Sequence, residues 1–336
     1  MKRHNNLFEP MLSFENLHHA FRLSARGKRN QPEVIRYRYN LETNLFALRD
    51  RLLAEDYDFG PYWSFMVHDP KPRLIVSAPF EDRVVHHAMC NILTPIFEKT
   101  FISDSYACRD SKGTHAAVFR LQNFMRRERD GYVLQCDIRK YFQSVDHAIL
   151  KSLIRCKIKD VKLLALTDRV IDSAPVHPDF GEGKGLPIGN LSSQLFANVY
   201  LNPLDHFIKE DLHRKFYIRY VDDFTVLGED KAQLHEIKSR IAAFLDQSLK
   251  LHLHRNKSQV FPIRKGCTFL GYRVWTHKRR VKTATMVRIR RKEKMLRKAY
   301  WEGKIPIEKY RQTIDSFLGH MKWGDGNSSL TKQLLE

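Results

Sequence analysis

Residues 216–227, Phe-Tyr-Ile-Arg-Tyr-Val-Asp-Asp-Phe-Thr-Val-Leu, decide how the middle of this chain folds. Apolar residues lie on both sides of the acidic pair Asp222-Asp223, which predicts two strands joined by a tight turn that holds the pair. An isolated Asp-Asp usually marks a turn that faces water, but apolar strands on both sides are unusual for such a turn. Adjacent carboxylates repel each other unless a cation lies between them. The stretch therefore predicts a hairpin that presents a cation site.

A third carboxylate, Asp137, ends the apolar stretch 132–138, which we expect to be another strand. Helices and strands are then predicted at residues 148–153, 192–204, 231–251, 259–263 and 268–275. This order is typical of an α+β domain with an antiparallel sheet that carries helices. Phosphoryl transfer to a growing strand uses two divalent metals, and Mg²⁺ prefers carboxylate oxygens. Asp137, Asp222 and Asp223 are therefore the candidate catalytic and metal-binding residues.

The rest of the chain is predicted to be helical, with one further hairpin. Within residues 61–78, strand-forming aromatic residues precede the turn His68-Asp69-Pro70-Lys71-Pro72, and a second short strand follows it. Lys71 and Arg73 should therefore lie near the tip of this hairpin. Apolar periodicity predicts helices within residues 1–60, at 81–99 and at 307–321.

The chain of 336 residues is strongly basic. Its 58 Lys and Arg against 38 Asp and Glu give a net charge of +20, which favours a polyanionic partner over a merely soluble basic protein. Twelve of the basic residues lie within 273–300, where Glu293 is the one acid. The five cysteines form no C-x-x-C pair and are odd in number, which predicts reduced thiols. No apolar run is long enough for a membrane span or a signal peptide, so we expect a cytoplasmic protein with no membrane partner.

Two motifs around the carboxylates resemble those of reverse transcriptases. Tyr220-Val221-Asp222-Asp223 is similar to the Y-x-D-D box, and 137–142, Asp-Ile-Arg-Lys-Tyr-Phe, is similar to the first palm motif. The resemblance implies a right-hand polymerase with an N-terminal helical extension (1–60), fingers (61–130), an antiparallel-sheet palm (131–275, with part of the fingers interleaved) and a helical thumb (276–336). It also implies two Mg²⁺ ions, with Mn²⁺ able to substitute, bound by Asp137, Ile138, Asp222 and Asp223.

Further motifs follow in the order of that family. Residues 105–109 with Gly113 resemble the second finger motif, 256–258 resemble the motif whose lysine lies near the leaving pyrophosphate, and 269–272 resemble the hairpin that grips the primer end. Phe142 corresponds to the steric gate against a ribose 2′-hydroxyl. The resemblance implies deoxynucleotide contacts at Lys71, Arg73, Arg139, Tyr141, Phe142, Gly189 and Lys257. Nucleic-acid contacts are expected at Arg109 and, in the basic thumb, at Arg288, Arg290, Arg291, Lys294, Arg297 and Lys298.

One segment distinguishes classes within the family. Residues 188–194 read Ile-Gly-Asn-Leu-Ser-Ser-Gln, which resembles the form found in diversity-generating retroelements rather than the more common Q-G-x-x-x-S-P. That resemblance implies a bacterial or phage enzyme that copies a template-repeat RNA into cDNA with errors at adenines, for mutagenic retrohoming. The implied partners are the template RNA, the RNA/cDNA duplex, dNTPs and a small basic oligomeric accessory protein. Ile188 and Gln194 are the candidate fidelity residues, because Ile188 holds the base pair only by shape, which discriminates weakly.

Three alternatives remain open. Ile188 is a neutral packing residue in the first. In the second, the enzyme is a reverse transcriptase of another bacterial class, such as a group II intron-like, retron or phage-defence enzyme; about 60 residues follow Gly271-Tyr272, enough for a thumb alone, whereas intron proteins usually extend further. The third is a non-enzymatic RNA-binding module, which the intact Asp137, Asp222 and Asp223 disfavour.

Overall fold

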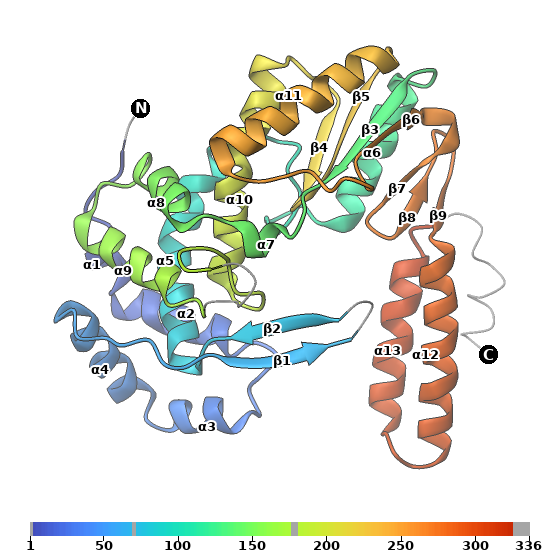
Figure 1. Ribbon diagram of the computed structural model, residues 1–336. Helices are drawn as coiled ribbons and strands as arrows, with labels where there is room; N and C mark the ends of the chain where they lie inside the picture. The colour runs from blue at the N-terminus through green and yellow to red at the C-terminus, as the bar shows by residue number, and fades with distance from the viewer. Residues whose placement is uncertain (1–2, 69–71, 176–180, 325–336) are drawn as a thin grey trace. The chain divides into compact units, whose positions relative to one another are not determined.

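The computed structural model describes residues 3–68, 72–175 and 181–324, and Figure 1 shows its helices and strands. The chain forms two compact units. The first comprises residues 1–103, 138–211 and 241–253, and the second comprises residues 104–137, 212–240 and 254–336. Neither unit is a continuous stretch of sequence, because the chain passes from one to the other several times.

The first unit is built mainly of helices around two buried ones, α5 (Phe80–Glu98) and α10 (Leu191–His206). The predicted helical segment 1–60 is confirmed as α1 (Phe8–Met11), α2 (Phe14–Ser24), α3 (Pro32–Tyr39) and α4 (Leu41–Leu53). The remaining helices are α7 (Tyr141–Ser144), α8 (His147–Arg155), α9 (Val161–Asp172) and the π-helical turn η1 (Phe207–Asp211). Asp146 and Asp160 cap α8 and α9 by accepting backbone N–H groups, which explains where these helices begin.

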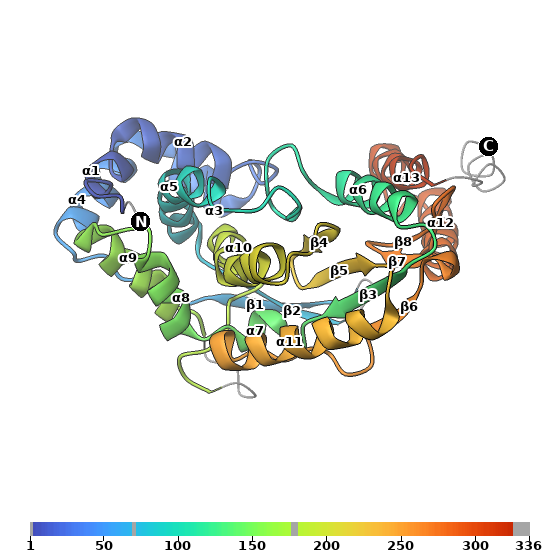
Figure 2. The same cartoon turned by 90° about the horizontal axis from the view of Figure 1, so that it is seen from above.

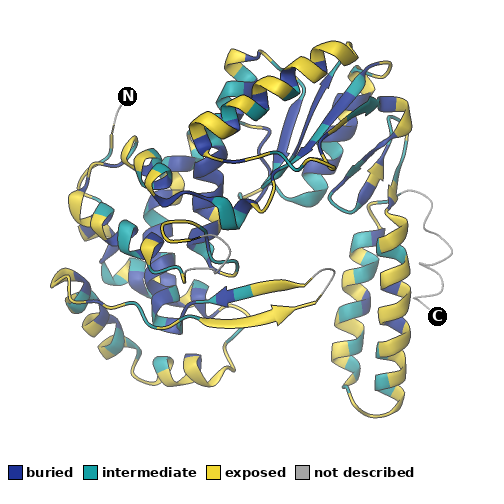
Figure 3. Ribbon diagram, in the orientation of Figure 1, coloured by how far each residue is buried: buried dark blue, intermediate teal, exposed yellow. Residues whose placement is uncertain are grey.

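The predicted hairpin of the first unit is also present, as β1 (Trp63–Val67) paired with β2 (Arg73–Ser77). Its strands are antiparallel, with Val67 opposite Arg73 at the described end nearest the tip. Figure 3 shows β1 exposed along its length, while β2 becomes buried toward Val76. Lys71 lies outside the described residues.

The second unit contains a four-stranded antiparallel sheet in the order β4-β5-β3-β6. The strands are β3 (Tyr132–Asp137), β4 (Tyr217–Tyr220), β5 (Asp223–Gly228) and β6 (Gln259–Pro262). Helix α6 (Thr114–Arg127) covers one face (Figure 2), where Val118, Leu121 and Met125 pack with Val133 and Ile218. The antiparallel α+β class predicted from the sequence is confirmed. Helix α11 (Lys231–Leu249) continues from this unit into the first one.

A second, three-stranded sheet and a helical hairpin complete this unit. Strands β7 (Cys267–Phe269), β8 (Tyr272–Val274) and β9 (Arg279–Val281) follow the 3-10 turn η2 (Ile263–Lys265) and lead into α12 (Thr283–Trp301) and α13 (Ile307–Met321). The strand predicted at 268–275 is divided into two, because the chain reverses at Leu270 and Gly271, both of which have positive φ. The reversal gives the hairpin at 269–272 that the family resemblance implied. Helices α12 and α13 run antiparallel and share a small apolar core around Ile289, Ile314 and Met321.

Candidate active site

Two of the three candidate carboxylates lie directly opposite each other on neighbouring strands. Asp137 is the last residue of β3, Asp223 is the first residue of β5, and the two are partners in the antiparallel register. Side chains of such partners lie on the same face of a sheet within contact distance. Asp223 therefore belongs to the strand rather than to the turn, where we had predicted it. Only Val221 and Asp222 form the turn between β4 and β5.

The turn that carries Asp222 has a strained backbone. Val221 has a φ of +57°, a left-handed conformation that is a genuine outlier for a β-branched residue. Beneath it, the Arg219 guanidinium is fully buried and donates a hydrogen bond of 3.1 Å to the Val221 carbonyl. Arg219 is itself held by backbone hydrogen bonds from its N–H to the Asp104 carbonyl and from the Tyr106 N–H to its carbonyl. A buried cation thus fixes the position of the acidic turn.

The surroundings of Asp223 change the pKa of its carboxyl group. Burial, and after it the negative charges of Asp222 and Asp137, raise the pKa of Asp223 to about 7. The side-chain amide of Gln135, 3.4 Å from Asp223 Oδ1, and the ammonium of Lys257 partly offset the increase in pKa. A carboxyl group with this pKa takes up a proton near neutral pH unless a cation neutralises its surroundings.

Lys257 is the cation that the fold brings to this cluster. Its Nζ lies 2.8 Å from both carboxylate oxygens of Asp137. The segment before it is anchored on the same residue, since the His254 N–H donates to the Asp137 carbonyl at 2.7 Å and the Lys257 N–H donates to the His254 carbonyl. The sequence predicted Lys257 near a leaving pyrophosphate, but it gave no sign of this ion pair with Asp137.

The donor chemistry of the cluster fits a hard divalent cation. In the described ranges, no three His, Cys, Asp or Glu side chains already close around a single point, and Lys257 provides the positive charge beside Asp137. Asp137 and Asp223 are register partners, and the charges of Asp222 and Asp137 both contribute to the raised pKa of Asp223. Carboxylate oxygens in such a group are the ligands that Mg²⁺ and Mn²⁺ prefer. Asp137, Asp222 and Asp223 are therefore the residues that would hold the metal.

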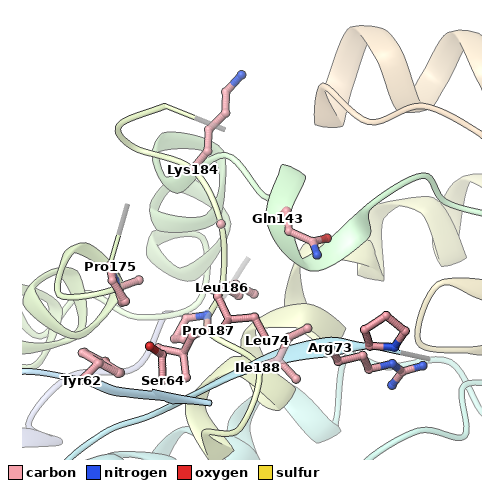
Figure 4. A pocket seen from close by; sticks show the side chains of 14 residues that line it. Tyr62, Ser64, Arg73, Leu74, Gln143, Pro175, Lys184, Leu186, Pro187 and Ile188 are labelled. Carbon is pink, nitrogen blue, oxygen red and sulfur yellow. The ribbon is translucent and has the colours of Figure 1, made fainter. Parts of the chain in front are cut away.

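The first unit contains a cavity of about 500 Å³ (Figure 4), which is lined by one predicted nucleotide-binding residue and one predicted fidelity residue. Arg73 and Ile188 both line it, together with Leu74, Leu186 and Pro187. The Val76 N–H donates to the Ile188 carbonyl at 2.8 Å and ties this segment to β2. A Cβ atom on Gly189, whose φ is +131°, would lie 3.0 Å from Ile75 and 3.2 Å from the Val76 carbonyl. Glycine at position 189 therefore allows the close approach of the two segments.

The adjacent aromatic residues Tyr141 and Phe142 have different environments. Tyr141 is buried and its hydroxyl donates to the Ala197 carbonyl at 2.5 Å, so its side chain is part of the core. Phe142 is half-buried, and its carbonyl accepts from the Leu186 N–H at 2.6 Å beside the cavity. Of the two residues, Phe142 is therefore the one that is partly exposed.

The other predicted residues near these motifs are mostly on the surface. Arg139 and Gln194 are exposed, whereas Ile138 is buried and leaves only its backbone carbonyl as a possible metal ligand. The Arg109 guanidinium donates to the carbonyl of Ser105 at 2.8 Å, so part of it supports the loop that contains it.

The basic helix α12 carries the remaining predicted nucleic-acid contacts. Arg288, Arg290, Arg291 and Lys294 are exposed. Two of the predicted contact residues have acidic partners. Arg297 pairs with buried Glu293 at 2.6 Å, and Lys298 lies 3.7 Å from Glu302.

Comparison with known proteins identifies the family. Residues 68–274, more than half of the chain, match the sequence profile described as "Reverse transcriptase (RNA-dependent DNA polymerase)". The chain belongs to the reverse transcriptase family. It is therefore an RNA-directed DNA polymerase of right-hand fold that binds an RNA template, and its family generally uses divalent metal ions.

Individual proteins are similar to parts of the chain. Protein YkfC of Escherichia coli K12 is 28% identical over 281 residues, covering 70% of this chain and 72% of YkfC. The group II intron-encoded protein LtrA of Lactococcus lactis is 24% identical over 271 residues, covering 60% of this chain but only 44% of LtrA, so the chain matches less than half of that relative. Among solved structures, telomerase of Candida albicans gives a TM-score of 0.47 at 10% identity, covering 67% of this chain and 47% of the telomerase.

None of the helices in the described ranges is long and apolar enough to cross a bilayer.

Proposed function

We propose that this reverse transcriptase copies a template-repeat RNA into cDNA with errors concentrated opposite adenines, as the polymerase of a diversity-generating retroelement. The observation that carries the proposal is the apolar side chain at position 188. Ile188 lines the cavity beside Arg73 and is fixed to β2 through its backbone carbonyl, yet its side chain offers no hydrogen-bond donor or acceptor. A site that holds a base pair by shape alone discriminates by only about 1–3 kcal/mol.

The proposed chemistry is extension of a primer 3′-hydroxyl on Asp137, Asp222 and Asp223. These carboxylates would hold two Mg²⁺ ions, or Mn²⁺ in their place, with the backbone carbonyl of Ile138 as a further ligand. Held there, the ions would supply positive charge for activation of the attacking hydroxyl and for stabilisation of the leaving pyrophosphate. The buried Arg219 keeps Asp222 in place through the Val221 carbonyl, and Lys257 supplies positive charge at Asp137, next to the phosphates that react.

Selection of the deoxynucleotide is proposed to depend on the first unit. Arg73, and with it Lys71, would bind the triphosphate, with Arg139, Gly189 and the backbone of Tyr141 around the nucleotide. Phe142 would exclude a ribose 2′-hydroxyl.

The RNA/cDNA duplex would contact Arg109 and the exposed residues of α12. Residues 61–130, 131–275 and 276–336 would act as fingers, palm and thumb, with 1–60 as an N-terminal extension. A small basic oligomeric accessory protein is proposed as a partner, and the host is proposed to be a bacterium or phage, with the enzyme in the cytoplasm.

The test is the error spectrum of cDNA made on a primed RNA of mixed sequence with all four dNTPs and Mg²⁺. We expect errors to cluster opposite template adenines for the wild type and for Ile188→Val, which keeps an apolar branched side chain. Ile188→Gln should lower the adenine errors, while Asp222→Ala/Asp223→Ala should give no product. An adenine error frequency that is the same in Ile188→Gln and the wild type would refute the role of residue 188. If extension occurs only with co-expressed neighbouring proteins, the accessory partner is supported.

A second candidate is a reverse transcriptase related to those of group II introns, which the match to LtrA favours. An enzyme of this class does not need to introduce errors into its cDNA. Extension with a low error frequency that is even across the four template bases would support it and exclude the diversity-generating function. Asp137, Asp222 and Asp223 would have the same roles in both cases.

A further inference from the structure

The polar side chain of Asn190 is buried at the start of α10. Only 2% of the residue is exposed, and its backbone is extended just before Leu191, the first residue of the helix. An asparagine in this N-cap position usually accepts a hydrogen bond from a backbone N–H of the first helical turn. The Asn190 side chain makes no such bond. Its amide therefore has a role other than capping α10.

The amide joins the start of the helix to strand β2 instead. Asn190 Nδ2 donates to the Val76 carbonyl at 3.2 Å, and Asn190 Oδ1 accepts from the buried Ala78 N–H at 3.1 Å. A side-chain amide has the same donor and acceptor as a peptide group. These two bonds therefore continue the contact that the Val76 N–H makes with the Ile188 carbonyl. We call the three hydrogen bonds between residues 76–78 and 188–190 the Asn190 clamp.

The clamp holds the second edge of a hairpin. In the described part of the chain, β2 pairs with β1 alone in a two-stranded sheet, and β1 is exposed along its length. A two-stranded hairpin is only marginally stable by itself. The position of β2 relative to residues 188–190 therefore depends on the clamp.

The two segments that the clamp joins carry opposing parts of the cavity described above. Arg73 and Leu74 of β2 line it, and so does Ile188 (Figure 4). Asn190 itself lies outside the set of described residues that line the cavity. A shift at the clamp would move Arg73 relative to Ile188, and a misplacement of about 1 Å in a binding group can lower the efficiency of an enzyme by about 10²-fold.

We propose that Asn190 is a positioning residue for the incoming nucleotide. It fixes the spacing between Arg73 and Ile188 and thereby lowers the KM for dNTP, without touching the nucleotide. The inference rests on the nucleotide-binding role of Arg73 proposed above. The competing interpretation is that Asn190 only stabilises the core, which predicts a loss of stability with no selective change in KM.

The test compares two isosteric variants of the full-length protein. Asn190→Asp keeps the acceptor for the Ala78 N–H but replaces the amide donor with a second acceptor oxygen. Asn16→Asp makes the same change at another bridge of the first unit, where the Asn16 amide donates to the carbonyls of Met11 and Ala88. The KM for dNTP and kcat are measured on a primed RNA, and stability is measured by urea unfolding.

We expect Asn190→Asp to raise the KM about tenfold while kcat changes by less than about twofold. Asn16→Asp should lose stability as well but keep the KM within about twofold of the wild type. In an Arg73→Ala background, Asn190→Asp should raise the KM by less than about threefold more, because the clamp acts through Arg73. Asn190→Ser keeps a hydroxyl group that can donate or accept, so it should give an intermediate KM. It serves as the comparison if Asn190→Asp does not fold.

Three results would overturn the proposal: an unchanged KM in the position 190 variants, equal KM values for Asn190→Asp and Asn16→Asp, or a full-sized effect of Asn190→Asp in the Arg73→Ala background. A raised KM in Arg73→Ala together with an unchanged KM in Asn190→Asp refutes the positioning role alone. An unchanged KM in Arg73→Ala refutes the proposed nucleotide-binding role of Arg73, and the positioning role fails with it.

Discussion

Replacing Asp223 with Asn should remove a pH-dependent loss of stability from the metal-free enzyme. The pKa of Asp223 is raised to about 7, chiefly by burial and then by the charges of Asp222 and Asp137, whereas an aspartate in an unfolded chain has a pKa of about 3.9. Between these values the folded state binds more protons than the unfolded state, so the free energy of unfolding falls as pH rises. Above about pH 7 the carboxylate is charged in both states and the loss is complete.

The magnitude follows from the pKa difference. Between about pH 5 and about pH 7 the carboxyl group is protonated in the folded state but ionised in the unfolded state. Raising the pH from about 5 to about 8 therefore includes about two pH units of this difference, which corresponds to up to about 3 kcal/mol. We expect wild-type protein in EDTA to lose up to that amount relative to Asp223→Asn over this interval. Asp222→Asn should keep most of the loss, because burial rather than Asp222 is the largest cause of the shift. Saturating Mg²⁺ should reverse the trend for the wild type, since bound metal stabilises the ionised form.

The assay is urea unfolding followed by circular dichroism at the two pH values, with and without EDTA. Other titrating groups are common to both proteins, so the difference between them isolates Asp223. If wild-type protein and Asp223→Asn lose the same free energy of unfolding between the two pH values, then the carboxylate is not protonated in the folded state, and the reasoning fails.

Three further changes test other parts of the structure. Val221→Gly should relieve about 1–2 kcal/mol of left-handed backbone strain, which the greater entropy of the unfolded chain partly offsets. Urea unfolding should therefore show a small gain in stability. The value of kcat should fall, because the turn that carries Asp222 is less rigid. Asp160→Ala removes an acceptor that binds the N–H groups of Leu7 and Phe8 as well as capping α9, and should lower the urea stability by about 2 kcal/mol. An unchanged unfolding midpoint for Asp160→Ala would contradict this role. Phe142→Ala should raise the relative kcat/KM for ribonucleotides by about tenfold or more, and an unchanged preference would exclude the ring as the gate.

The sequence predicted the elements that carry the candidate site because local patterns determine them. Asp137 follows an apolar strand, and the pair Asp222-Asp223 interrupts an apolar hairpin. Both positions can therefore be predicted from the pattern of apolar residues and from the residue types that favour turns. The helix at 307–321 was predicted to the residue. Each of these features depends on residues that are close together in the chain.

Features that depend on long-range contacts could not be read in the same way. The register that places Asp137 opposite Asp223, and the ion pair between Asp137 and Lys257, join positions about 90 and 120 residues apart. The burial of Tyr141 likewise depends on a carbonyl from α10, at Ala197. No periodicity in a single sequence encodes such pairings, because they result from the packing of whole elements.

The strained turn explains why Arg219 is buried without access to water. A valine in the left-handed region costs about 1–2 kcal/mol, and that conformation persists only if the surroundings fix it. The Arg219 guanidinium does so through the Val221 carbonyl, and the backbone of residues 104–106 fixes Arg219 in turn. Ser105 forms a parallel bridge with Arg219 of β4. The segment 105–109, which resembles a finger motif, therefore begins beside the sheet that carries the candidate active site. Its contribution to catalysis would then be to position Asp222, and a substitution that breaks the 104–106 bridge should lower kcat more than it changes the KM for dNTP.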